Sequence, residues 1–134
     1  MITEVLARRL ADLGLTWQPA PGDRFVVDNP ELVEQVLHLA DMTIESHQLD
    51  TGTIFTFNGT TEWALDSVAK ENTLWLPRED QLRQALGDSF RSLSRQGGRW
   101  VVDIQVDGDL ATATDADVEC AYARALIRVL GVAT

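Results

Sequence analysis

The chain is poor in the residues that build disulfides, metal sites and phosphate-binding loops. Its 134 residues include one cysteine, Cys120, one lysine, Lys70, and two histidines, His38 and His47. A lone cysteine excludes an intramolecular disulfide and cannot form a structural zinc site unaided. Cys120 falls within a helical apolar pattern, so we predict a buried, unreactive thiol.

Several sequence motifs of enzymes are also missing. Lys70 does not neighbour a glycine, so the chain has no Gly-x-x-x-x-Gly-Lys-Ser/Thr loop. It contains neither Gly-x-Gly-x-x-Gly nor Gly-x-Ser-x-Gly. These absences exclude nucleotide hydrolysis through a P-loop and remove several large enzyme classes. We therefore predict no catalytic constellation and no cofactor.

Basic residues are outnumbered. The chain has 21 acids and 11 Lys and Arg residues, which gives a net charge of −10. Affinity for nucleic acid depends largely on Lys and Arg, so this balance argues against a nucleic-acid partner. An anionic membrane surface would repel the chain for the same reason. No apolar run reaches the roughly 18 residues of a membrane-spanning helix, and residues 1–20 lack the apolar core of a signal peptide. We expect a cytoplasmic protein.

The remaining composition is typical of one folded domain. Hydrophobic residues make up 45% of the chain and charged residues 24%, with four Trp and four Phe. A chain of this length buries about two thirds of the surface that its unfolded form exposes. We predict a single domain over residues 1–134.

Local patterns predict helices at both ends. Apolar residues recur at helical spacing over residues 2–13, with Thr3 as the N-cap and Gly14 as the stop. Near the other end, Thr114 and Asp117 fit a capping box for a last helix that Gly131 ends.

Strands dominate between these helices. Alternation and β-branched residues predict strands at 25–27, 42–47, 53–57 and 73–76. Residues 31–40 fit either a helix or a strand, and we narrowly favour the strand.

Two more helices and two hairpins complete the pattern. A short helix is expected from Thr60 or Thr61 to Val68. Another follows Pro77, and its apolar stripe runs on to Leu93 with a break at Gly87-Asp88. Gly97-Gly98 and Asp107-Gly108 predict hairpin turns. The fold class is therefore α+β, with an antiparallel or mixed sheet and helices packed mainly on one face.

Charge is unevenly distributed. Residues 23–71 hold ten acids and two bases. Arg83, Arg91 and Arg95 would share one face of a helix, where we expect pairing with Glu79 and Asp88. A molecule with one acidic side and one arginine-bearing side favours head-to-tail or dimeric contact.

Two groups of residues suggest metal binding, and for both an ordinary role is favoured. His38 and His47, with Glu45 or Asp41, have the residue types of a two-histidine, one-carboxylate site, but their spacing matches no compact ligand signature. A second group consists of Asp103, Asp107, Asp109, Asp115, Asp117 and Glu119. It lacks the spacing of a calcium loop, so we interpret it as a solvated strand face and a helix cap.

The densest stretch of candidate binding residues runs from Phe57 to Asp66 and from Leu74 to Leu82. Two Trp residues and an Arg flanked by acids, within about twenty residues, are typical of an interface hot spot. The alternative is that Trp63 and Trp75 fill the core while Arg78 pairs with Asp66 or Glu79. The candidate binding residues are Asn58, Trp63, Asp66, Trp75, Arg78 and Asp80.

These two stretches also carry a resemblance. The segments FNGTTEWALDSV and WLPREDQL, with the alanine-rich AYARAL near the end, resemble a group of small actinobacterial proteins over most of the length. Some members carry a pilus-assembly label of the CpaE type. The assembly proteins of that name resemble ParA/MinD-type ATPases, which need the P-loop that this chain lacks. The resemblance implies a bacterial cytoplasmic protein and assigns no catalytic residues.

The sequence thus favours a non-enzymatic binding or adaptor domain that acts through protein contacts, as a homodimer or with another protein. The alternative is a small-ligand-binding protein or a modest hydrolase with a pocket near Trp63, Trp75 and Arg78, where the Arg would hold a carboxylate or phosphate. Metal-dependent activity through His38 and His47 comes third.

Overall fold

A computed structural model describes residues 1–27, 36–38, 44–49, 52–57, 67–69 and 72–132. The chain divides into two compact units: unit 1 comprises Met1–Thr16 with Pro77–Thr134, and unit 2 comprises Trp17–Leu76. The α+β class, with antiparallel sheets and a helix at each end of the chain, is confirmed. The single domain over residues 1–134 stays a prediction.

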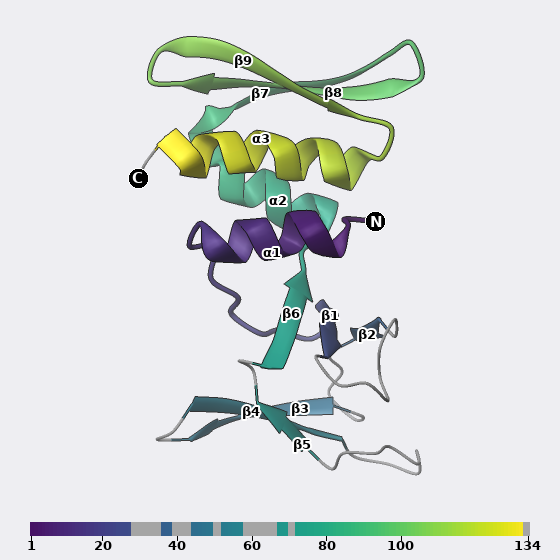
Figure 1. Ribbon diagram of the computed structural model, residues 1–134, viewed down its shortest axis with the longest axis vertical. Coiled ribbons are helices and arrows are strands. Elements are labelled where there is room, and N and C mark those ends of the chain that lie inside the picture. Colours follow the sequence, from purple (N-terminus) through teal and green to yellow (C-terminus); the bar gives the residue numbers. More distant parts are fainter. Residues whose placement is uncertain (28–35, 39–43, 50–51, 58–66, 70–71, 133–134) are drawn as a thin grey trace. The chain divides into compact units, whose positions relative to one another are not determined.

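Unit 1 is a three-layer arrangement built around its last helix. Its elements are α1 (Glu4–Asp12), α2 (Glu79–Leu86), β7 (Phe90–Gln96), β8 (Arg99–Val106), β9 (Asp109–Asp115) and α3 (Val118–Val132). The strands form an antiparallel sheet in the order β7-β8-β9. Helix α3 packs against β8 and β9 on one side and against α1 and α2 on the other (Figure 1). Because α3 is covered from both sides, Tyr122, Ala123 and Leu126 are buried.

Side chains that point toward α3 alternate with side chains that point to the outer face along β8, and this alternation determines which face of the sheet packs against α3. Val102 and Ile104 are both 0% exposed, whereas Asp103 between them points to the outer face. The two hairpins turn where the sequence predicts. Asp107 and Gly108 have φ of 50° and 84°, the left-handed pair that a two-residue hairpin of type I′ requires.

Helix α1 follows its predicted caps. The Thr3 hydroxyl accepts a hydrogen bond from the Leu6 amide over 3.3 Å, and Gly14 follows the helix with a φ of 102°. Ile2, Leu6 and Leu10 are buried at helical spacing, so the amphipathic pattern is confirmed.

Unit 2 contains two small antiparallel sheets. One has the order β2-β1-β6, with β1 at Arg24–Val27, β2 at Leu37–His38 and β6 at Thr73–Leu76. The other has the order β3-β4-β5, with β3 at Ile44–Leu49, β4 at Gly52–Phe57 and β5 at Ser67–Ala69. The strands predicted at 25–27, 53–57 and 73–76 are confirmed, and the strand expected at 42–47 begins at Ile44 and ends at Leu49. In the first sheet, Phe25 and Leu76 are 0% and 1% exposed.

Four expectations are wrong. Phe90 and Leu93 lie in β7, because α2 ends at Leu86 and Gly87 takes a positive φ of 55°. Arg91 and Arg95 are therefore strand residues and share no helical face with Arg83.

The other two errors concern the start of a helix and a strand. Thr114 belongs to β9, so Asp117 caps α3 without it. The expected end of α3 at Gly131 is met to within one residue, since the helix ends at Val132. Val68 lies in β5, not in a helix. The helix expected around residues 60–66 falls outside the described residues, as does most of 31–40, of which Leu37–His38 is strand.

Candidate binding surfaces

The predicted site residues are distributed over the chain as follows. Asn58, Trp63 and Asp66 fall outside the described residues. Trp75 belongs to unit 2, whereas Arg78 and Asp80 belong to unit 1.

Trp75 takes part in an aromatic cluster of unit 2. Its ring stacks on that of Trp17 with centroids 6.4 Å apart and an interplanar angle of 9°. Trp17 also contacts Phe25, with ring centroids 5.5 Å apart. Phe25 is the cross-strand partner of Trp75 in the β1–β6 pair. Trp75 is half-buried, so it contributes to the core of unit 2 and keeps part of its surface exposed.

A buried carboxylate holds this cluster in place. Asp23 is 1% exposed, and its Oδ2 accepts hydrogen bonds from Nε1 of Trp17 over 2.8 Å and from the amide of Ala20 over 3.0 Å. Buried carboxylates require such donors, because an unpaired charge in the interior is costly. Sequence reasoning missed this residue, and the only signal was an acid directly after the Pro21-Gly22 turn.

The indole N–H of Trp75 is different. Its Nε1 is buried, and within the described part of the chain it is one of the side-chain polar atoms without a hydrogen-bond partner. Tyr122 Oη is another such atom, in unit 1. Each is a donor that a ligand or a water molecule would satisfy.

Arg78 serves the start of α2. Its Nε lies 3.2 Å from Oδ1 of Asp80, and its amide donates to Oε1 of Gln81 over 2.9 Å. The hydrogen bond from Arg78 lowers the pKa of Asp80. The side chain of Asp80 is 72% exposed, so the pair contributes little to stability. Among the described residues Arg78 thus pairs with Asp80, a partner that the sequence did not suggest; of the two suggested acids, Asp66 lies outside the described residues.

Among the residues that the structure describes, no group of three or more His, Cys, Asp or Glu side chains is arranged to hold a metal ion. His38 lies exposed in β2, and His47 lies in β3. The acids of unit 1 have other roles: Asp103 lies on the outer sheet face, Asp107 in a turn, and Asp115 and Asp117 at the start of α3.

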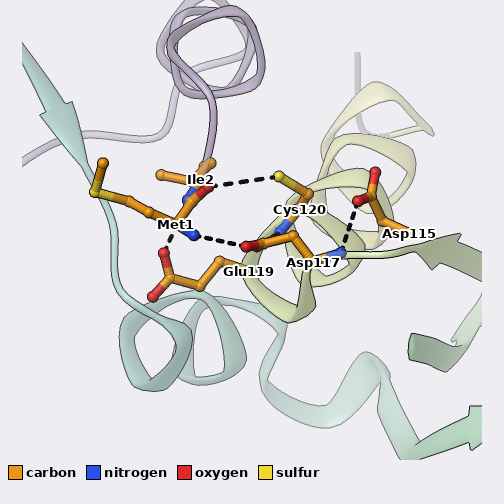
Figure 2. A network of polar contacts seen from close by, with 6 residues as sticks. All are labelled: Met1, Ile2, Asp115, Asp117, Glu119 and Cys120. Atoms are coloured by element: carbon orange, nitrogen blue, oxygen red, sulfur yellow. Dashed lines mark hydrogen bonds and ion pairs between the residues drawn. The ribbon is translucent and has the colours of Figure 1, made fainter. Parts of the chain in front are cut away.

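The start of α3 holds the N-terminal residues through a polar network (Figure 2). The Met1 ammonium lies 2.6 Å from Oδ2 of Asp117, and the amide of Ile2 donates to Oε1 of Glu119 over 2.9 Å. Oδ1 of Asp117 also accepts from the Cys120 amide over 3.0 Å. The carboxylates stabilise the positive end of the helix dipole while they join α1 to α3.

These contacts change the acidity of the groups involved. The hydrogen bond to Asp117 raises the pKa of the Met1 ammonium. Burial tends to raise the pKa of Asp117, but the hydrogen bond from the ammonium and that from Cys120 outweigh it and lower the pKa. Burial raises the pKa of the Cys120 thiol, and the residue is 4% exposed. The predicted buried, unreactive cysteine is confirmed in its burial, and a raised pKa disfavours the reactive thiolate.

Asp115 interacts with two guanidinium groups. Its Oδ2 is 3.0 Å from Nε of Arg124, and Arg99 is close enough to act on it electrostatically. Burial tends to raise the pKa of Asp115, but the Asp117 amide, Arg124 and Arg99 together lower it. Arg124 therefore pairs with this carboxylate, and Arg99 attracts it electrostatically, at this end of β9.

The outer face of the unit 1 sheet carries a polar ladder. One oxygen of Asp103 accepts from the Ser92 hydroxyl of β7 and the other from the Thr112 hydroxyl of β9, each over 2.9 Å. Arg91 donates from Nε to Gln105 over 3.0 Å on the same sheet. This face is ordered by its own hydrogen bonds.

The two edge strands of this sheet are unequally protected. Strand β7 has a register shift between Phe90 and Ser92 and carries Arg91 and Arg95, and bulges and charges are common protection for an edge. Strand β9 pairs with β8 in continuous register and has no charge, proline or glycine from Leu110 to Thr114. Leu110 is 78% exposed.

Comparisons with known proteins return nothing: no family model, no curated protein and no solved structure matches the chain. No helix among the described residues is long and apolar enough to cross a membrane.

Proposed function

We propose that the chain is a non-enzymatic binding module that acts through protein contacts, with unit 2 as the part that engages a basic partner. The observation that carries this proposal is the distribution of charge between the units. Unit 2 holds ten acids and two bases, whereas the two segments of unit 1 together hold eleven acids and nine bases.

Nearly all of the net charge therefore belongs to unit 2. A strongly charged surface attracts a partner of opposite sign and accelerates the encounter, and it repels other acidic proteins. Unit 1 is almost neutral and has a buried core of its own around α3, which suits a scaffold.

The experiment begins with affinity capture by the full chain from an extract of its source cells at about 0.05 M and about 0.5 M salt, because screening weakens such contacts at the higher value. The captured protein is then purified, and its affinity for the chain is measured by calorimetry. Asp28→Asn, Glu31→Gln and Glu34→Gln are combined in one variant of unit 2. The matched control combines Asp12→Asn, Asp88→Asn and Asp107→Asn, which neutralises three exposed acids of unit 1.

We expect the unit 2 variant to lose about tenfold or more in affinity and the control to lose less than about threefold. The partner should also be a basic protein. If no protein binds at either salt concentration and the chain sediments as a strict monomer, the proposal is wrong.

The unpaired indole N–H of Trp75 favours a second candidate, which is small-ligand binding in unit 2. A half-buried ring stacked on Trp17 suits a planar molecule, and its buried N–H, which has no partner among the described residues, would donate to an acceptor of that molecule. A thermal-shift screen of aromatic carboxylates against the full chain, repeated with Trp75→Phe, tests this candidate. Shifts that persist unchanged in the variant would exclude it.

A further inference from the structure

The β8–β9 hairpin determines which backbone groups of β9 are free. In a two-residue hairpin the residues that flank the turn, here Val106 and Asp109, form a hydrogen-bonded pair, and such pairs then recur at every second residue. The amides and carbonyls of β9 that point away from β8 are therefore those of Leu110, Thr112 and Thr114. Within the described strands β9 has no neighbour on that side.

These free groups are self-complementary. If two copies of β9 lie antiparallel with Thr112 opposite Thr112, Leu110 of each copy falls opposite Thr114 of the other. Each of these positions presents one donor and one acceptor, so all the outward groups are satisfied at once. Short β-branched and small side chains allow the close approach that such pairing needs.

The ends of the strand are complementary in charge. This arrangement places Asp109 of each copy beside Asp115 of the other. Asp109 is exposed and forms no ion pair with the described residues. Asp115 is ion-paired with Arg124, and Arg99 also acts on it electrostatically, so Asp109 of the other copy would approach an end of β9 that carries two guanidinium groups. Two carboxylates and two guanidinium groups would then meet at each end.

We propose that β9 pairs with β9 of a second copy about a two-fold axis at Thr112, which joins two three-stranded sheets into one six-stranded sheet. This inference goes beyond the proposed function, because it adds a second copy of the chain to the basic partner of unit 2. Strand β7 is unsuited to the same role, since its bulge and its two arginines oppose pairing.

Sedimentation velocity over a concentration series is the first test, and a reversible dimer of the full chain is expected. Thr112→Pro removes one outward amide. The amide is unpaired within the chain, so the sheet of unit 1 should survive, as proline is accepted at the exposed side of an edge strand. The dimer dissociation constant should rise at least about tenfold. Thr112→Val keeps the amide and loses only the hydroxyl bond to Asp103, and it should remain a dimer.

Charge reversal gives an independent readout. Asp109→Arg places a third guanidinium at each end of the pairing and should weaken the dimer by about tenfold or more. Asp88→Arg makes the same change at an exposed position away from β9 and should leave the dimer unchanged.

Cross-linking fixes the register. In a Cys120→Ala background, Thr112→Cys places two thiols on cross-strand partners about 5.5 Å apart between Cα atoms, so a short bismaleimide should join the copies. Leu110→Cys places them about 14 Å apart, and the same reagent should not.

A wild-type chain that remains monomeric at high concentration would overturn the pairing. A dimer that Thr112→Pro and Asp109→Arg leave intact, or that cross-links through residue 110 instead of 112, would overturn it as well. In either case unit 2 can still bind its basic partner in calorimetry, so the failure of the dimer is distinguishable from the failure of the proposed function.

Discussion

The carboxylate of Asp23 accepts the indole N–H of Trp17 over 2.8 Å in the interior of unit 2, where the two residues are 1% and 6% exposed. Asp23→Ala should lower the free energy of unfolding by about 1–3 kcal/mol, because it leaves a buried donor unsatisfied. Urea unfolding followed by tryptophan fluorescence measures this change. Asp23→Asn keeps an acceptor and should cost less; an equal loss in both variants would show that the negative charge itself is required.

Asp117 joins the N-terminal residues to α3, and its effect should depend on pH. Its lowered pKa means that the stabilisation is present above the ordinary value of 3.8 and is lost as the pH falls. The raised pKa of the Met1 ammonium means that its share is present below 8.0 and is lost as the pH rises. Asp117→Asn keeps the cap and removes the charge, so its stability deficit should be largest between these two values.

Asp117→Ala removes the cap as well and should cost about 1 kcal/mol more than Asp117→Asn at every pH. Thermal unfolding of both variants from pH 3 to pH 10 provides the comparison. A deficit of Asp117→Asn that is the same at all these pH values would contradict the ion pair.

Alanine substitutions at two glycines should change the stability of the protein in opposite directions. Gly108 has a φ of 84°, which alanine adopts only with strain, so Gly108→Ala should destabilise unit 1 by about 1 kcal/mol. Gly131 lies in α3 with no positive φ and open space around its Cα, so Gly131→Ala should stabilise by up to about 1 kcal/mol. Differential scanning calorimetry of the pair is the measurement, and shifts of the same sign would be inconsistent with the hairpin and the helix end described above.

Tyr122 combines complete burial with a hydroxyl that has no partner among the described residues. Removing an unsatisfied polar group from the interior is neutral or favourable, so Tyr122→Phe should leave the melting temperature unchanged or raise it. The stacking of its ring on Phe90, with centroids 5.9 Å apart, is retained in this variant. A marked loss of stability would reveal that the hydroxyl binds a water molecule.

Helix ends and turns that depend only on neighbouring residues were predictable from the sequence. Thr3, Gly14 and the Asp107-Gly108 turn act through their own backbone conformation and their nearest neighbours, so pattern alone located them. Phe90 and Leu93 were misassigned for an instructive reason. The bulge in β7 places Phe90 opposite Ile104 and Leu93 opposite Val102, so residues three apart share one sheet face and imitate helical spacing.

The site residues were less predictable than the elements. The contacts of Asp23 and the N-terminal contacts of Asp117 join groups that only the fold brings together, so no pattern of residue spacing in the sequence predicts them. Trp75 was expected as either core or site, and it is half-buried in the cluster with Trp17. Arg78 was expected to pair with Asp66 or Glu79; among the described residues it pairs with Asp80, and Asp66 lies outside them.

The bond between Met1 and Asp117 spans 116 positions of the chain, with all of unit 2 between them. At a synthesis rate of about 5–20 residues per second, the residues of α1 are therefore made roughly 6 to 23 s before those of α3. Throughout that interval α1 lacks its packing against α3, whereas every residue of unit 2 is synthesised before α3. Chaperones that bind nascent amphipathic helices should accordingly recognise α1 during this interval, because unit 2 is synthesised in full before the last helix of unit 1.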